Sequence, residues 1–138
     1  MGDSYNKKSE KFEGEIWSEI QEPPIDAPTI HSYAVIFYGS NHYFFGGYSA
    51  GNELSSILAL QKKYWTWSNV GKMKTTRAYH EVILIGNRFM LIGGDYIKKN
   101  EACQLFYHQF NCTEFSSSLQ DYFSFPILYL VDDDYRDC

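Results

Sequence analysis

Residues 29–47, TIHSYAVIFYGSNHYFFGG, decide the fold, because a related stretch, TRAYHEVILIGNRFMLIGG, follows at residues 76–94. The two stretches align without a gap, and six of the 19 positions are identical, including Val35 with Val82 and both residues of a closing Gly-Gly pair. Self-similarity at a period of 20–50 residues is typical of repeat proteins. The chain is therefore expected to contain one structural unit of about 47 residues twice.

The repeat pattern extends beyond these stretches in both directions. Past the Gly-Gly pair an offset of 48 aligns Asn52-Glu53 with Asn100-Glu101 and Trp67 with Phe115. We interpret the chain as a fragment of a longer array with four parts. These are the last strands of a preceding unit with a linker (1–28), two complete units (29–70 and 76–118) and the start of a further unit (126–138).

Short apolar runs bounded by turn residues predict four β-strands in each unit. The first two strands (33–38 and 42–45, then 80–85 and 88–92) are joined by Gly-Ser-Asn or Gly-Asn, which is a hairpin signal. Third strands are expected near 54–60 and 102–108, and fourth strands near 64–70 and 112–117. The first strands are apolar at consecutive positions, which indicates that both of their faces are covered. The predicted fold is all-β, with four-stranded antiparallel sheets stacked face to face.

The paired glycines, the Arg77-Ala78-Tyr79-His80 opening and the late aromatic residue together resemble the kelch repeat. The first unit departs from that pattern, because it has Ile30 and Tyr33 where the second has Arg77 and His80. The resemblance implies an incomplete β-propeller of about two blades. It also implies a structural role for three aromatic residues that would fill the space between blades, namely Trp17, Trp67 and Phe115.

Composition and charge narrow the class of partner and the compartment. The net charge is −5, so a nucleic-acid binder is not expected, and no apolar run reaches the 18 residues of a membrane span. The N-terminus does not resemble a signal peptide. The three cysteines, Cys103, Cys112 and Cys138, have no metal or redox spacing and are expected to be free thiols, which favours the cytoplasm. The N-glycosylation sequon that begins at Asn111 would instead be relevant in a secreted protein.

No constellation of residues indicates catalysis, a cofactor or a metal. The four histidines form no pair with metal-ligand spacing, and the glycine pairs lack the spacing of a phosphate-binding loop. Asp132-Asp133-Asp134 aligns with a hairpin turn, for which aspartate is suited. The sequence therefore predicts a non-catalytic protein–protein interaction module, as a piece of a larger adaptor or scaffold. Two alternatives stay open: a fragment of a galactose-oxidase-like kelch enzyme, and a truncated product without a function of its own.

A protein partner is expected to bind at one loop face. In a four-stranded meander, the loop after the second strand and the connection to the next sheet lie at the same end. Loops at such an end can vary without disturbing the packed sheets. The predicted partner contacts are Tyr48, Asn52, Lys74, Arg77, Tyr96 and Lys98. Uncovered sheet faces would in addition favour self-association.

Overall fold

The computed structural model describes residues 9–24, 30–95 and 99–116, which form strands and no helix. The strands are β1 (Ser9–Glu13), β2 (Ile16–Ile20), β3 (Ala34–Tyr38), β4 (Asn41–Phe45), β5 (Tyr48–Ser49), β6 (Asn52–Glu53), β7 (Ser56–Gln61), β8 (Thr66–Lys72), β9 (His80–Ile85), β10 (Arg88–Gly93), β11 (Lys99–Phe106) and β12 (Gln109–Ser116). The predicted all-β class is confirmed. The predicted start of a further unit at 126–138 lies outside the described residues.

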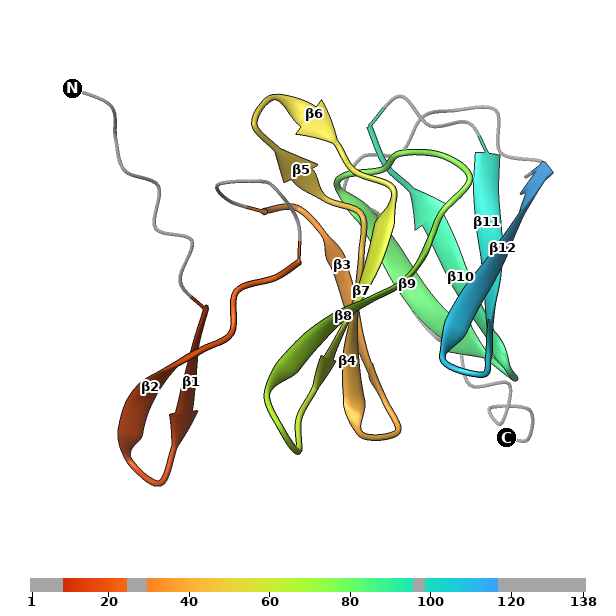
Figure 1. The fold of residues 1–138 in the computed structure, drawn as a ribbon. Coiled ribbons are helices and arrows are strands. Elements are labelled where there is room, and N and C mark those ends of the chain that lie inside the picture. The colour runs from red at the N-terminus through yellow and green to blue at the C-terminus, as the bar shows by residue number, and fades with distance from the viewer. Residues whose placement is uncertain (1–8, 25–29, 96–98, 117–138) are drawn as a thin grey trace, which may run out of the picture.

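Two four-stranded antiparallel sheets form the body of the molecule (Figure 1). The strand order β3-β4-β7-β8 makes the N-terminal sheet, and the order β9-β10-β11-β12 makes the C-terminal sheet. Each is a meander in which sequence neighbours pair, apart from the small β5–β6 hairpin inserted between β4 and β7. A separate β1–β2 hairpin precedes them, and none of these sheets closes on itself.

The backbone repeats in the first half of each unit, as the alignment of 29–47 with 76–94 requires. Residues 47 positions apart share a positive φ, a conformation that most residues avoid. The pairs are Ser32 (57°) with Tyr79 (55°), Gly39 (63°) with Gly86 (61°), Gly46 (58°) with Gly93 (76°), and Gly47 (108°) with Gly94 (115°). At Gly46 a Cβ would lie 2.5 Å from the carbonyl oxygen of Arg77, so the glycine is also required by a close backbone approach.

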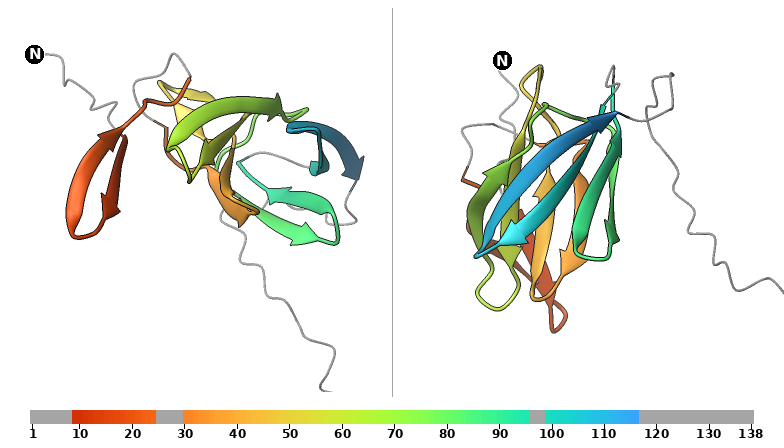
Figure 2. Two further views of the ribbon diagram at one scale, coloured as in Figure 1. Left: turned by 60° about the horizontal axis from the view of Figure 1, so that its bottom comes forward. Right: turned by 90° about the vertical axis from the view of Figure 1, so that its right-hand side faces the viewer.

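The two sheets pack face to face, with β3 beside β9 and β8 beside β12 (Figure 2). The core between them is a cluster of aromatic rings from both sheets. Tyr43 and Phe45 of β4 contact Phe89 of β10 and Phe110 of β12, with ring centroids 5.1–6.1 Å apart. Burial of these large rings is the main favourable contribution to holding the sheets together.

Each sheet has one packed face and one open face, and we name them by their residues. The front face of the N-terminal sheet carries Ile36, Tyr38, Tyr43 and Phe45, and its back face carries Val35, Phe37, Phe44, Leu58, Leu60 and Trp67. The residues 47 positions further on define the same faces in the C-terminal sheet. Its front face carries Ile83, Ile85, Met90 and Ile92, and its back face carries Val82, Leu84, Phe89 and Leu91. The front face of the N-terminal sheet packs on the back face of the C-terminal sheet.

Part of the sequence alignment is wrong beyond the Gly-Gly pair. Trp67 is paired with Leu60 on the back face, whereas Cys112 occupies the corresponding place in β12, paired with Cys103. Phe115 points to the front face, so it is not the counterpart of Trp67. The offset changes because β4 and β7 are separated by the β5–β6 hairpin, while the connection between β10 and β11 is shorter.

Two further predictions from the pattern need correction. The third strand of the second unit ends at Phe106 rather than continuing to residue 108, because Tyr107 and His108 form a two-residue turn with φ of 46° and 67°. The expected filling of the space between the sheets by Trp17 is also wrong. Its side chain lies on the β1–β2 hairpin, 66% exposed, and contacts Phe12.

Candidate functional site

One end of the molecule gathers the β5–β6 hairpin and the connection from β8 to β9 (Figure 1). We name residues 48–53 and 73–79 the loop rim. Thr76 of the connection donates a hydrogen bond to the Glu53 carboxylate of β6, at 3.4 Å, which joins the two segments. In addition, the Arg77 amide donates to the Leu54 carbonyl at 3.0 Å. The structure thus brings together the segments in which four of the six predicted contacts lie.

Three predicted contacts are accessible on the loop rim. Tyr48 is half-buried, stacks on the ring of His31 and donates its hydroxyl proton to the Gly51 carbonyl at 3.0 Å. Asn52 and Lys74 are exposed. Tyr96 and Lys98, the other two predicted contacts of the β10–β11 connection, lie outside the described residues.

Arg77 is not a surface contact, which corrects its predicted role. Its side chain is fully buried and donates to the Glu101 carboxylate (3.2 and 3.3 Å) and to the carbonyls of Gly93 (2.9 Å) and Lys99. Desolvation lowers the pKa of the guanidinium, and the nearby Glu101 charge opposes that effect. From the sequence, Arg77 was predicted to be an exposed loop residue. Its hydrogen-bond acceptors could not be recognised there, because they lie on β10 and β11, 16–24 positions away.

Glu101 is the residue of this region that the sequence did not single out. It lies in the middle of β11, fully buried, and receives four hydrogen bonds. Besides the two from Arg77, the amides of Lys74 and Thr75 donate to its two carboxylate oxygens at 2.8 and 2.9 Å. The carboxylate therefore holds the β8–β9 connection against the C-terminal sheet. The sequence held no signal for this role, because Glu101 takes the place of Leu58 in the N-terminal sheet, whereas the alignment had paired it with Glu53 of the β5–β6 hairpin.

Acidic groups dominate the rest of the loop rim and its border. Burial raises the pKa of Glu53, opposed by the hydrogen bond from Thr76, and the nearby Asp95 charge raises it further. The hydrogen bond from Thr75 and that from Lys99 lower the pKa of Glu114. With the exposed Lys74 and with Lys99, which pairs with Glu114 at 3.2 Å, the surface offers both carboxylate acceptors and cationic donors to a polar partner.

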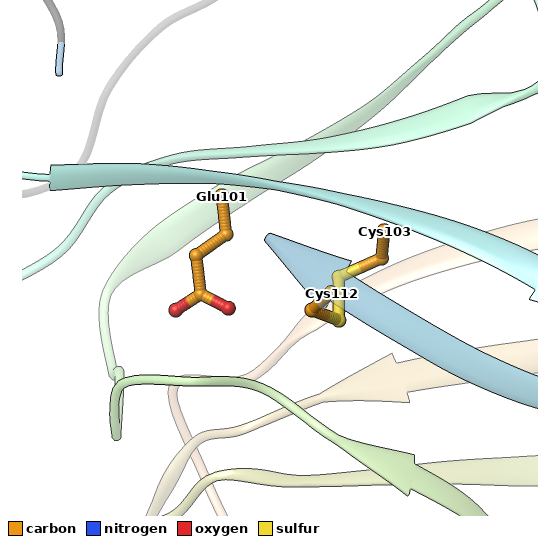
Figure 3. Close-up of side chains that lie close together, drawn as sticks. All are labelled: Glu101, Cys103 and Cys112. Carbon is orange, nitrogen blue, oxygen red and sulfur yellow. A yellow bond between two sulfur atoms is a disulfide. The ribbon is translucent and has the colours of Figure 1, made fainter. Parts of the chain in front are cut away.

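Cys103 and Cys112 form a disulfide across β11 and β12, so the prediction of free thiols is wrong for these two residues (Figure 3). The two cysteines lie directly opposite each other in the register of neighbouring strands, which brings their side chains to the same face of the sheet. The spacing of the two cysteines in the sequence could not show that they are paired, because their alignment depends on the register of the β11–β12 hairpin. Cys138 lies outside the described residues.

The disulfide lies next to Glu101, and the three side chains offer ligand atoms within 4.8 Å of one another. Such a group resembles a metal site, but a disulfide has no thiolates to coordinate an ion. Both oxygens of Glu101 accept hydrogen bonds, and the adjacent guanidinium of Arg77 repels cations. The arrangement is therefore structural: the disulfide joins β11 to β12, and Glu101 holds the β8–β9 connection on the C-terminal sheet.

Two other features lie away from the loop rim. A cavity of about 470 Å³ between the β1–β2 hairpin and the N-terminal sheet is lined by Lys11, Glu13, Phe37, Gly39, Ser40, Lys62, Lys63 and Trp65. Asn111, the sequon asparagine, is exposed on β12. Within the described part of the chain, we find no apolar helix of the length that a bilayer crossing requires.

Comparison with known proteins gives no relative on which to base a function. No protein-family model matches the chain, and no curated protein matches it in sequence. The assignment of a function therefore depends on the geometry described above.

Proposed function

We propose that the chain is a non-catalytic protein-interaction module built from two kelch-type propeller blades, which binds a protein partner on the loop rim. The observation that carries this proposal is the clustering of connections at one end of two sheets stacked in parallel register. First strand lies beside first strand and fourth beside fourth, as in adjacent blades of a propeller. Such a stack leaves the connecting loops free to vary, and binding residues are common on loops held by a rigid scaffold.

The loop rim has the chemistry of a polar protein contact. Tyr48 presents an aromatic ring whose hydroxyl is already directed by Gly51, and tyrosine is a frequent anchor in interfaces. The rim is held by the buried Arg77 and Glu101, so it loses little freedom on binding. We infer that the partner is a protein surface with basic groups facing Glu53 and Glu114.

Site-specific photo-crosslinking tests this proposal. A photoreactive residue is placed at Asn52 or Lys74 on the rim and, as a matched control, at Lys63, an exposed lysine in the turn between β7 and β8 at the opposite end. We expect covalent adducts with one protein partner from the two rim positions and none from Lys63. Equal labelling from all three positions, or labelling from Lys63 alone, would refute the proposal.

The oxidase alternative is disfavoured by the disulfide. A copper radical oxidase of the galactose-oxidase type needs a cysteine joined to a tyrosine, and the two cysteines among the described residues are joined to each other. The disulfide also bears on the compartment. Disulfides persist mainly in oxidising environments, so we propose that the chain matures in one rather than in the cytoplasm. Differential alkylation of the native protein, followed by peptide mass spectrometry, would detect free Cys103 and Cys112 if this is wrong.

A further inference from the structure

The interface between the two sheets joins unlike faces of the repeated unit. The front face of the N-terminal sheet packs on the back face of the C-terminal sheet, and the two sheets are copies of one unit. A pair related by a twofold axis would instead bury like faces against each other. An interface between unlike faces is heterologous, and among the described residues it leaves a complementary face free at each end of the stack.

Each free face occupies the same place in the repeated unit as one of the two buried faces and shares one identical residue with it. Val82 is buried in the interface, and its identical counterpart Val35 is 48% exposed on the back of the N-terminal sheet. In the same way Ile36 packs against the core, and its identical counterpart Ile83 lies on the open front of the C-terminal sheet. By their place in the repeat, the free faces are therefore equivalent to the surfaces that already pack together inside the molecule.

Both free faces expose apolar side chains on the first two strands of each sheet. On the back of the N-terminal sheet, Tyr33 and Phe37 are 40% and 55% exposed beside Val35. On the front of the C-terminal sheet, Ile85 is 55% exposed and Ile83 and Met90 are half-buried, with the charged Glu81 and Arg88 on the same face. Apolar faces of this kind on a protein surface mark interaction sites. The first strand is apolar at consecutive positions because it is suited to being covered on both sides.

We propose that a second copy of this chain binds head to tail, with the front of β9 and β10 in one copy packed on the back of β3 and β4 in the next. This inference specifies the faces and the polarity of self-association, and it does not depend on the loop rim as a binding site. The internal interface supplies the docking geometry, since Tyr38 contacts Phe89 there with ring centroids 5.4 Å apart. The equivalent contact between copies is Ile85 with His42.

The β1–β2 hairpin leaves this docking surface accessible. Its Lys11 contacts Trp65, at the turn between β7 and β8, with the ammonium 5.3 Å from the ring centroid. Lys11 and Glu13 are the hairpin residues that line the cavity toward the N-terminal sheet. The hairpin therefore lies near both turns of that sheet, including Phe37 at the end of β3, while Val35 on β3 is 48% exposed.

Two complementary charge variants test the head-to-tail arrangement. Val35→Asp places a charge on the back face and leaves the front face intact, while Ile83→Asp, opposite the uncharged Met90, does the reverse. An unpaired charge at the centre of an interface is expected to weaken association at least about 30-fold. In sedimentation velocity over a range of concentrations, we expect the unmodified chain to form species larger than a monomer and each variant alone to be monomeric. Tyr107→Asp, at a turn residue that is 99% exposed, is the matched control and should associate like the unmodified chain.

The decisive measurement is a mixture of the two variants. Each variant lacks one face and retains the other, so the mixture should give a 1:1 dimer that does not grow further. If like faces associate instead, one variant alone will still dimerise and the mixture will give no new species, which would overturn the proposal. A monomeric unmodified chain would overturn it as well. Thermal unfolding of each variant, followed by circular dichroism, confirms that the monomers compared are folded.

Discussion

Replacing Glu101 by glutamine tests whether the buried ion pair holds the β8–β9 connection in place. In the native chain one carboxylate oxygen accepts bonds from Thr75 and Arg77, and the other accepts the Lys74 amide at 2.8 Å. A glutamine can supply one acceptor oxygen only. Its NH₂ group would face an N–H donor, and the fully buried guanidinium of Arg77 would lose its counter-charge.

The expected loss of stability follows from this geometry. Removing one partner of a buried pair costs about 3–5 kcal/mol, because an uncompensated charge is left in the interior. Taking about 4 °C per kcal/mol for a chain of this length, the unfolding midpoint should fall by about 12–20 °C. The measurement is thermal and urea unfolding of the E101Q variant at neutral pH, with circular dichroism as the probe.

Glu114→Gln is the matched control for this experiment. Glu114 faces Glu101 across the strands and also binds the connection, through the Thr75 hydroxyl at 2.7 Å, but its side chain is 32% exposed. Exposed pairs contribute little to stability, so this variant should stay close to the unmodified protein. If E101Q and E114Q lose the same small amount of stability, the buried pair does not have the structural role assigned to it.

Three further predictions concern stability. Burial, with a smaller contribution from the Arg77 charge, lowers the pKa of His80 to about 4, so the folded state binds its proton less readily than the unfolded state does. The contribution of His80 to the free energy of unfolding should be fully present above pH 6.5 and fall by about 3 kcal/mol as the pH drops to 4. Urea unfolding at several pH values should show a weaker acid dependence for a His80→Phe variant. Replacing Cys103 and Cys112 by serine should lower the free energy of unfolding by about 2.7 kcal/mol, because a bridge between residues nine positions apart reduces the entropy of the unfolded chain. Equal stability of the unmodified protein with and without reductant would contradict this. Gly46→Ala should lower the free energy of unfolding by at least about 3 kcal/mol, because the added Cβ would collide with backbone atoms. Gly39→Ala, at a residue with open space and the same sign of φ, should lower it by about 1–2 kcal/mol. Similar losses for both variants would show that the close backbone approach at Gly46 is unimportant.

The class of fold and its first two strands per unit could be predicted from the sequence. Turn residues and short apolar runs are local signals, because glycine adopts the positive φ that the turns require and apolar runs favour strands with covered faces. The equivalence of residues 29–47 with 76–94 therefore persists in the backbone dihedral angles of the structure. The part of the unit after the Gly-Gly pair was aligned wrongly, since the lengths of the connections are free to differ between copies.

The amino-acid sequence by itself determined that this protein contains a repeated unit of short antiparallel strands with a double-glycine turn. The tertiary structure alone decided the fate of Arg77, which becomes buried because Glu101 approaches it from a strand 24 positions away. It also decided that Cys103 and Cys112 are bonded, through the register of one hairpin. Local propensities set the strands, but burial and pairing depend on which surfaces the folded chain brings together, and no local pattern contains that information.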